Sequence, residues 1–283
     1  MSAIIIDGKA TAKAIRHALK AEIAELGLTP GLTTVLVGDD PASEVYVRSK
    51  GKIAKRLGFK SESIRLPAKT SQPELVEYIQ RLNADKTVHG ILVQLPLPAH
   101  IDEQVIIETI DPQKDVDGFH PYNVGRLSIG VPTFIPCTPL GVQKLLEAYN
   151  LDPFGKHVVI VGRSNIVGKP QALIFVQKAA WANATVTICH SRTQNIAEIT
   201  RQADILVAAI GQANFITADM VKEGVIAIDV GVNRWEDGTL CGDIDFKGVA
   251  EKAYAITPVP GGVGPMTIAM LMYNTVQAAK LYR

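Results

Sequence analysis

The chain has 283 residues, of which 29 are Lys or Arg and 28 are Asp or Glu, so its formal net charge is +1. This balance creates no strong field that would attract nucleic acid or an anionic membrane, and no apolar run approaches the roughly 20 residues that span a bilayer. The hydrophobic fraction of 47% is typical of a globular chain, and the length is sufficient for two domains.

The cysteines and the first residues indicate the compartment. Cys137, Cys189 and Cys241 are far apart, without the spacing of a metal site or of paired disulfides. The start of the chain lacks the long apolar stretch and small-residue cleavage site of a signal peptide. We therefore expect a protein of the reducing cytoplasm with no metal, in which Cys189 is a small core residue.

Short apolar runs alternate with helical stretches along the chain. The runs lie at 33–38, 89–95, 157–162, 184–189, 204–211 and 225–231. They are continuous rather than alternating, which indicates strands of a parallel sheet covered on both faces. The helical stretches lie at 71–84, 139–149 and 168–180. This alternation predicts an α/β fold with parallel sheets.

The segment 43–58 is predicted to be a helix with a lysine on its apolar face. At 100° per residue, Tyr46, Ile53 and Leu57 form one stripe, and Lys50 lies in its middle. Burying a lone ammonium costs several kcal/mol unless it is paired. Lys50, with Tyr46 one turn earlier, is therefore a candidate catalytic group. The alternative is that Lys50 extends from the edge of the stripe to water.

Three polar side chains downstream are candidates for ligand binding. Gln94 interrupts an apolar strand, where an amide needs hydrogen-bond partners. Asp115 and Asp117 are two positions apart in the Pro- and Gly-rich segment 111–139, which we expect to be a loop-rich wall of the active site. They could bind a divalent cation, but no third ligand cluster accompanies them. We expect one to cap a turn and the other to contact a ligand.

The segment 156–170 has the features of a dinucleotide site. A buried strand ends at Gly162 and a helix begins near Gly168, so free backbone N–H groups at the helix N-terminus could meet phosphate oxygens. The usual G-x-G-x-x-G spacing is not present; the turn offers Gly162, Ser164 and Gly168. A plain strand–helix turn is the alternative.

The next strand end indicates which dinucleotide would bind. An NAD site would place an acidic residue there for the ribose 2′-OH, but the chain has Ser191 and Arg192. Together with Arg163, these are suitable partners for a 2′-phosphate, so NADP is favoured. The alternative is that Arg192 is merely exposed in a loop. A later strand brings Val232 to the same carboxyl edge of the sheet.

The C-terminal part begins with the segment 257–267, TPVPGGVGPMT, which holds three prolines and three glycines. This composition suggests backbone that passes close to a flat ligand. The last segment, 265–283, is predicted to be an amphipathic helix that returns to pack on the first domain.

Seven long motifs are similar to one known family. They are SEVYVRSK (43–50), HGILVQLPLP (89–98), KDVDGFHP (114–121), PCTPLG (136–141), GRSNIVGKP (162–170), ATVTICHSRT (184–193) and PVPGGVGPMT (258–267). Over essentially its whole length the chain resembles the bifunctional methylenetetrahydrofolate dehydrogenase/cyclohydrolases. One departure is the stretch 174–182, which looks a few residues longer than usual and which we expect to lengthen a helix near the dimer surface.

The resemblance implies a role for each candidate in the first half. Lys50 resembles the family's catalytic lysine, which serves water attack and proton transfer in the cyclohydrolase step. Gln94 would hydrogen-bond Lys50 and help to set its protonation, and Tyr46 would stack over the folate. Asp117 would bind the amino and ring N–H groups of the pterin, with Ser43 close to this cluster.

The resemblance also implies the remaining ligand contacts and the domain plan. The aminobenzoate region would be lined by Pro258, Pro260, Gly261 and Gly262. NADP would be held by Gly162, Arg163, Ser164, Ser191, Arg192 and Val232. We expect a folate-binding catalytic domain at 1–139, completed by the helix 265–283, and a Rossmann-like NADP-binding domain at 140–264. The family resemblance further implies a homodimer.

The implied activity has two steps in one-carbon metabolism. A hydride passes from 5,10-methylenetetrahydrofolate to NADP⁺, and water then converts the methenyl product to 10-formyltetrahydrofolate. The first alternative is a monofunctional enzyme that has lost one step. The presence of both Lys50 and a complete cofactor turn argues against this alternative. The second is a nucleotide-sensing protein without turnover.

Overall fold

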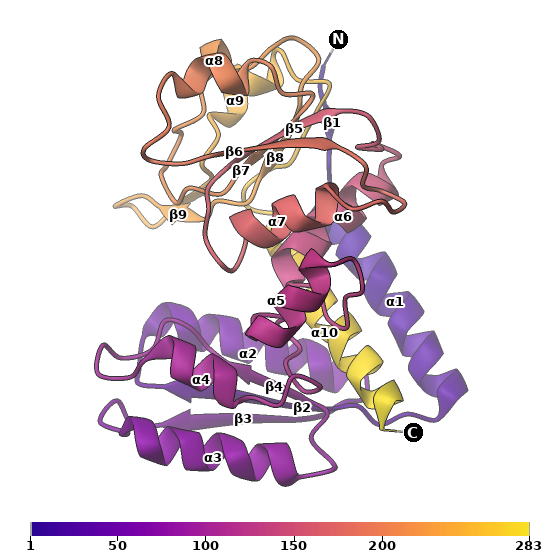
Figure 1. Cartoon of the computed structure of the whole chain (residues 1–283), viewed down its shortest axis with the longest axis vertical. Helices are drawn as coiled ribbons and strands as arrows, with labels where there is room; N and C mark the ends of the chain where they lie inside the picture. The colour runs from indigo at the N-terminus through magenta and orange to yellow at the C-terminus, as the bar shows by residue number, and fades with distance from the viewer. Residues whose placement is uncertain (1, 283) are drawn as a thin grey trace. The chain divides into compact units, whose positions relative to one another are not determined.

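The computed structural model describes residues 2–282, which form two compact α/β units, as the sequence predicted (Figure 1). The Lys50 unit comprises Ile15–Ile135 and the residues from Leu271 onward. The Rossmann-like unit comprises the residues up to Ala14 and Pro136–Met270. The expected division at 1–139 and 140–264 differs from this grouping at the N-terminus, because the first strand pairs within the Rossmann-like unit.

The Lys50 unit is built on a parallel three-stranded sheet of order β3-β2-β4. Its strands are β2 (Gly31–Val37), β3 (Lys60–Leu66) and β4 (Gly90–Val93). The helices are α1 (Gly8–Leu26, shared with the other unit), α2 (Pro41–Arg56), α3 (Gln72–Ala84), α4 (Glu103–Thr109) and α5 (Pro121–Ser128). The first crossover runs from the central strand β2 to the edge strand β3, and the second runs back across β2 to β4. Because these directions are opposite, right-handed connections put α2 and α3 on opposite faces (Figure 1).

The core of the Lys50 unit lies between its sheet and the α3 side. Buried side chains of β2 and β4 contact Leu75 and Ile79 of α3 and Ile106 of α4. The α3 helix begins with a capping box, in which Ser71 accepts from the Glu74 N–H and the Glu74 carboxylate accepts from the Ser71 N–H. Such reciprocal bonds satisfy donors that a helix start leaves free, which explains why the helix begins where it was predicted.

The Rossmann-like unit is built on a parallel six-stranded sheet of order β1-β11-β8-β7-β5-β6. Its strands are β1 (Ile4–Ile5), β5 (His157–Val161), β6 (Thr185–Cys189), β7 (Ile205–Ala208), β8 (Ile226–Asp229) and β11 (Ala255–Ile256). A separate antiparallel pair joins β9 (Asn233–Arg234) to β10 (Leu240–Cys241). The apolar runs of the sequence correspond to the central strands, which are buried on both faces as expected.

Helices cover both faces of this sheet. They are α6 (Cys137–Ala148), α7 (Gly168–Phe175), α8 (Ile196–Thr200), the 3-10 helix η1 (Ala218–Met220), α9 (Phe246–Ala250) and α10 (Val263–Leu281), which continues into the Lys50 unit. Figure 1 shows α6 and α7 on one face and α8 and α9 on the other. Cys189 is fully buried in the cluster on the α8 side, as predicted. Within residues 2–282 no helix is both long and apolar enough to cross a membrane.

The structure corrects three expectations about strands and helices. The strand β6 is partly exposed, because it is the edge strand of its sheet. The stretch 174–182 does not lengthen a helix, since α7 ends at Phe175 and the next residues form turns. The segment 111–139 is not entirely irregular, because α5 begins there at Pro121 with the His120 side chain as its cap.

The C-terminal helix α10 was predicted to be amphipathic, but the structure shows that it is not. Its residues are buried around most of its circumference from Val263 to Ala279. The first part of the helix belongs to the Rossmann-like unit, and the last part, from Leu271, belongs to the Lys50 unit. Each part therefore buries its apolar side chains within its own unit. A helix that is apolar all round is expected where it is covered on all sides.

Candidate functional site

Lys50 and Gln94 are brought together in the Lys50 unit. Lys50 lies on α2 and is only 8% exposed, and its Nζ donates a hydrogen bond to Gln94 Oε1 over 3.0 Å. Gln94 follows directly after β4, and its Nε2 donates to the carbonyl oxygen of Leu95 over 2.7 Å. This second bond orients the amide with its oxygen toward the lysine. Lys50 does not extend to water, so the alternative reading of this residue is wrong.

The buried face of α2 differs from the predicted stripe. Ser43, Val47, Lys50 and Ala54 are buried, whereas Tyr46 is 46% exposed. The buried face is therefore rotated away from Tyr46, because the helix packs against the sheet through Val47 and Ala54. The exposed ring of Tyr46 is accessible to a flat ligand, and its proposed stacking role does not require burial.

Of the two aspartates, Asp115 is the turn cap that the sequence analysis expected. Asp115 is 2% exposed and accepts hydrogen bonds from the N–H groups of Gly118, Phe119 and His120 and from Asn123 Nδ2. Burial raises the pKa of the Asp115 carboxyl, and the hydrogen bonds oppose this rise. Asp115 thus closes the turn that carries Asp117.

Asp117 is partly buried beside the end of β4. It lines a small hollow of about 20 Å³ together with Val93 and Leu95, the residues on either side of Gln94. Among the described residues, no group of three or more His, Cys, Asp or Glu side chains could hold a metal ion.

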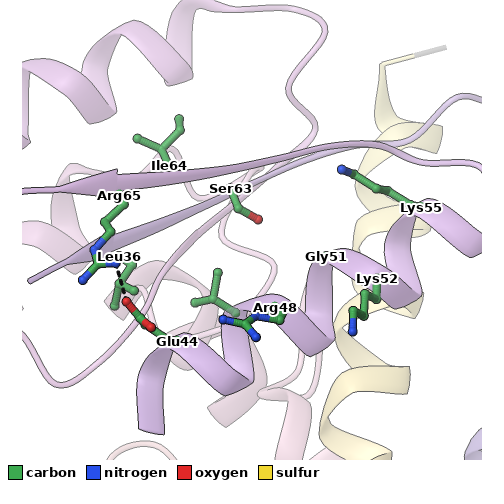
Figure 2. A pocket seen from close by; sticks show the side chains of 10 residues that line it. Leu36, Glu44, Arg48, Gly51, Lys52, Lys55, Ser63, Ile64 and Arg65 are labelled. Atoms are coloured by element: carbon green, nitrogen blue, oxygen red, sulfur yellow. Dashed lines mark ion pairs between the residues drawn. The ribbon is translucent and has the colours of Figure 1, made fainter. Parts of the chain in front are cut away.

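A larger hollow of about 370 Å³ lies on a different side of α2 (Figure 2). Figure 2 shows Arg48, Lys52 and Lys55 projecting from the helix around it, and Arg65 of β3 forming an ion pair with Glu44. Lys50, Gln94 and Asp117 are not among its lining residues. Its three helical cations are exposed side chains on the face of α2 away from Lys50, so we do not assign this hollow to the folate site.

The turn after β5 brings three strand ends of the Rossmann-like unit into contact. Gly162 has a φ of +135°, and a Cβ there would lie 2.2 Å from the carbonyl oxygen of Ala209 after β7. The Gly162 N–H donates to the carbonyl oxygen of Cys189, the last residue of β6. Only glycine fits this close approach. The helix α7 then begins at Gly168, as predicted.

Ser164 organises the start of α7. Its Oγ accepts hydrogen bonds from the N–H groups of Val167 and Gly168, at 3.1 and 3.4 Å. Arg163 and Ser164 are both exposed. The turn therefore presents a cationic side chain and a hydroxyl at a helix N-terminus, where anions bind favourably.

The residues after β6 and β8 lie at the same carboxyl edge. Ser191 and Arg192 are exposed in a turn in which the Arg192 N–H donates to His190 Nδ1 over 3.1 Å. Val232 follows β8 and is 48% exposed. Because β5, β6 and β8 belong to one parallel sheet, their carboxyl ends face the side where such folds bind ligands.

Two buried carboxylates support this edge and were not found from the sequence. Asp243 Oδ2 accepts from the N–H groups of Ile210 and Gly211 after β7, at 2.6 and 3.0 Å. Asp229 at the end of β8 accepts from the N–H of Gly231 at 3.0 Å and from that of Asp243 at 2.9 Å. Burial raises the pKa of Asp229 to about 7, and the nearby Asp243 contributes to this rise. Asp243 is far in the sequence from the N–H groups that it binds after β7, so no local pattern indicated this contact.

The glycines of the segment 257–267 pack against the start of α1. A Cβ on Gly8 would lie 1.7 Å from the carbonyl oxygen of Gly262, and the Lys9 N–H donates to the carbonyl oxygen of Gly261. The close approach that these glycines permit is thus to backbone of the same unit. Pro258 is partly buried and Pro260 is exposed, so these two predicted substrate contacts remain accessible.

Comparison with known families decides the identity of the fold. Residues 6–117 match the profile of the tetrahydrofolate dehydrogenase/cyclohydrolase catalytic domain, and residues 136–283 match that of the NAD(P)-binding domain of the same family. The chain belongs to the tetrahydrofolate dehydrogenase/cyclohydrolase family. The resemblance inferred from the seven motifs is confirmed.

Individual relatives agree over the full length. The chain is 59% identical to "Bifunctional protein FolD" of Halalkalibacterium halodurans, with 99% of this chain and 100% of the relative covered. It is similar to the crystal structure of the bifunctional enzyme FolD from Campylobacter jejuni, at 51% identity, a TM-score of 0.95 and 99% coverage of each chain. The Trypanosoma brucei FolD, solved with NADP cofactor and an inhibitor, matches at 41% identity and a TM-score of 0.94, with 99% and 98% covered.

Proposed function

We propose that this protein oxidises 5,10-methylenetetrahydrofolate to the methenyl form with NADP⁺ and then hydrolyses that product to 10-formyltetrahydrofolate. Its membership of a dehydrogenase/cyclohydrolase family supports both steps. The single structural observation that carries the proposal is the buried Lys50 amine bonded to Gln94 at 3.0 Å. A dehydrogenase alone has no need of a positioned amine, whereas hydration of the methenyl group requires proton transfer.

In the dehydrogenase step the protein mainly orients the reactants. NADP⁺, when bound, accepts the hydride from the one-carbon bridge of the folate. Asp117 binds the pterin N–H groups through charge-assisted hydrogen bonds, and the Tyr46 ring stacks on the folate. Ser43 lies on the buried face of α2 one turn before Tyr46, close to this cluster. Holding the donor carbon in place can lower the barrier by several kcal/mol without any acid or base.

In the cyclohydrolase step Lys50 moves the proton. Water adds to the methenyl carbon, and one of its protons passes to the Lys50 amine, which acts as the base. The amine then returns the proton to the ring nitrogen. As the carbon–nitrogen bond breaks, the remaining hydroxyl proton leaves to water and the formyl C=O bond forms. Gln94 keeps the amine in place, because its amide oxygen accepts a hydrogen bond from the lysine in either protonation state.

The residues at the carboxyl edge of the Rossmann-like sheet fit NADP. The close backbone approach at Gly162 makes a tight turn before α7, and Ser164 fixes that turn through its two accepted hydrogen bonds. Arg163, Ser191 and Arg192 are exposed and offer cationic and hydroxyl partners for the phosphates. Val232 would contact the cofactor from the end of β8. The T. brucei relative was solved with NADP, which supports this choice.

The assignment of the units and the assembly are part of the proposal. The Lys50 unit would bind the pterin, the Rossmann-like unit would bind NADP, and the segment from Pro258 to Gly262 would line the aminobenzoate region. We propose that the protein works as a homodimer in the cytoplasm, without a nucleic-acid or membrane partner. Light scattering of the purified protein would give the mass of a dimer, and a monomer mass would contradict this assembly.

One assay tests the activity and separates the alternatives. Purified protein is mixed with methylenetetrahydrofolate and either NADP⁺ or NAD⁺, and absorbance is followed at the bands of reduced nicotinamide and of methenyltetrahydrofolate. We expect reduced NADP to form with little methenyl accumulation. Accumulation in proportion to reduced NADP would indicate a monofunctional dehydrogenase. Hydrolysis of added methenyl substrate without dehydrogenation would indicate a cyclohydrolase, and neither reaction would indicate a binding protein.

A further inference from the structure

The peptide before Asp117 is held by a side chain from the far end of the sequence. Asn274 of α10 is 2% exposed, and its Nδ2 donates to the carbonyl oxygens of Val116 and Ile135 over 2.8 and 2.9 Å. The Val116 carbonyl belongs to the same planar peptide as the Asp117 N–H. The orientation of this plane therefore helps to set the direction in which the Asp117 side chain leaves the backbone.

The chain is also fixed immediately before this peptide. Lys114 is 1% exposed, and its Nζ donates to the carbonyl oxygens of Leu82, Asn83 and Asp85 at the end of α3, over 2.7–3.0 Å. Its own carbonyl oxygen accepts from the Ile91 N–H of β4 over 2.9 Å. These contacts fix the position of the segment but not the rotation of the peptide between Val116 and Asp117.

The chain is fixed after Asp117 by the Asp115 turn described above. The Asp115 carboxylate holds the N–H groups of residues 118–120, so the segment has little freedom on that side. Val116 itself packs on β4, where a Cβ at Gly90 would lie 2.8 Å from its Cγ1. Between these two anchors, Asn274 donates a side-chain hydrogen bond to the peptide that carries Asp117.

We propose that Asn274 is a positioning residue for folate, acting through the Asp117 carboxylate. This inference rests on the folate-binding role proposed above for Asp117. Removing the Asn274 amide takes these donors from the buried Val116 carbonyl and the partly buried Ile135 carbonyl, so the peptide is expected to turn toward other partners. A small rotation there displaces the carboxylate from its bonds to the pterin, and misplacement of about 1 Å can cost a large factor in rate.

A double-mutant cycle tests whether Asn274 acts through Asp117. Asn274→Leu removes both donors at nearly constant volume, and it is made in the native chain and in Asp117→Ala. The measured quantity is kcat/KM of the dehydrogenase for methylenetetrahydrofolate, which can be obtained below saturation in weak variants. We expect a loss of about tenfold in the native chain and of less than about twofold in Asp117→Ala, since residues that act as a unit are not additive.

A neighbouring residue supplies the matched control. Thr275 is 0% exposed on the same helix, but its Oγ1 donates to the Leu271 carbonyl oxygen within α10. Thr275→Val is expected to leave kcat/KM for the folate unchanged, and Asn274→Leu is expected to leave the affinity for NADP⁺ unchanged. If Asn274→Leu does not fold, Asn274→Ser carries the same cycle, because its short hydroxyl cannot bond both carbonyls.

The outcomes separate this inference from the proposed function. Equal losses from Asn274→Leu in both backgrounds would show that it acts independently of Asp117 and would overturn the inference. A similar loss in Thr275→Val, or a parallel loss of NADP⁺ affinity, would show general loosening and would overturn it too. Absence of folate turnover in the unmodified chain would instead overturn the proposed function, and the inference with it.

Discussion

Lys50 Nζ donates to Gln94 Oε1 over 3.0 Å, which joins the buried face of α2 to the residue that follows β4. The partner of the lysine is a neutral amide rather than a carboxylate. An amide oxygen accepts from an ammonium and from a neutral amine alike, so the lysine can gain or lose a proton without breaking an ion pair. This arrangement suits a group that must carry a proton during each turnover.

Replacing the neutral partner by a charged one should remove this freedom. Gln94→Glu keeps the shape but places a carboxylate beside Lys50, which favours the protonated amine. We expect cyclohydrolase activity to fall by roughly 10- to 100-fold, less than the about 10²–10⁴ of a deleted base because the amine is still present, and dehydrogenase activity to fall much less. Gln113→Glu, at an exposed position of the same unit, is the control. Equal losses of both activities would contradict the proton-transfer role of the pair.

Arg192 should decide the choice between the two dinucleotides. It is exposed beyond the end of β6, where no acidic residue is available for a ribose 2′-OH. Loss of a charge-assisted contact of about 1.5–3 kcal/mol corresponds to a roughly tenfold to hundredfold weaker affinity. We therefore expect Arg192→Ala to weaken NADP⁺ by this factor and NAD⁺ much less, measured by titration of each cofactor.

The control for this substitution is Arg201→Ala, because Arg201 is exposed on the same unit but bonds the Asp219 carbonyl oxygen. That variant should bind both cofactors as the native chain does. Equal weakening of NADP⁺ and NAD⁺ in Arg192→Ala would remove Arg192 from the 2′-phosphate and leave Arg163 as the candidate.

Asp117 should affect folate and not the cofactor. Its carboxylate faces the N–H donors of the pterin in the proposed complex, and Asp115 already closes the turn. We expect Asp117→Ala to lower both activities through a higher KM for folate, while NADP⁺ affinity stays within about twofold, because a lost charge-assisted bond acts locally. Steady-state kinetics and cofactor titration measure the two effects. Unchanged folate binding would show that Asp117 has no contact with the substrate.

The buried Asp229 predicts a pH dependence of stability in the Rossmann-like unit. Its pKa is raised to about 7 in the folded protein from an ordinary value of 3.8, so the folded state binds a proton that the unfolded state releases between these values. The stabilisation is complete below pH 3.8 and is lost as pH rises through about 7. The free energy of unfolding falls by about a few kcal/mol at most across this pH window.

Asp229→Asn carries no titrating proton and should lack this slope. Its amide oxygen can still accept from Gly231 and Asp243, although its NH₂ group faces the Ile244 N–H and lowers stability overall. Melting temperatures measured from pH 5 to pH 8 should therefore fall more steeply in the native chain than in the variant. Parallel curves would show that Asp229 does not titrate in this range.

The sequence predicted the central strands and the lysine site because their signals are local. Continuous apolar runs identify strands buried on both faces, and β5, β7 and β8 are such strands. The edge strand β3 was not predicted, since its sequence KSESIRL is largely polar and only its pairing with β2 makes it a strand. The two-residue strands β1 and β11 are also defined by pairing rather than by pattern.

The details of the site depended on tertiary structure. A helical wheel places Tyr46 and Lys50 on one face, but the packing of Val47 and Ala54 against the sheet turns Tyr46 outward. Asn274 is about 160 positions from Asp117, and no periodicity relates them. The family resemblance suggested which residues contact ligands, whereas the side chains that hold those residues in place became visible only in the fold.

The most direct test of this account is the ratio of the two activities in Lys50→Met. Methionine keeps the volume and apolar stem of the buried lysine but lacks the amine, and it buries no new polar group. Loss of a positioned general acid or base costs on the order of 10²–10⁴ in rate. The account predicts near-complete loss of cyclohydrolase activity, measurable dehydrogenase activity and accumulation of the methenyl product. A fall of both activities by the same factor, or of neither, would contradict it.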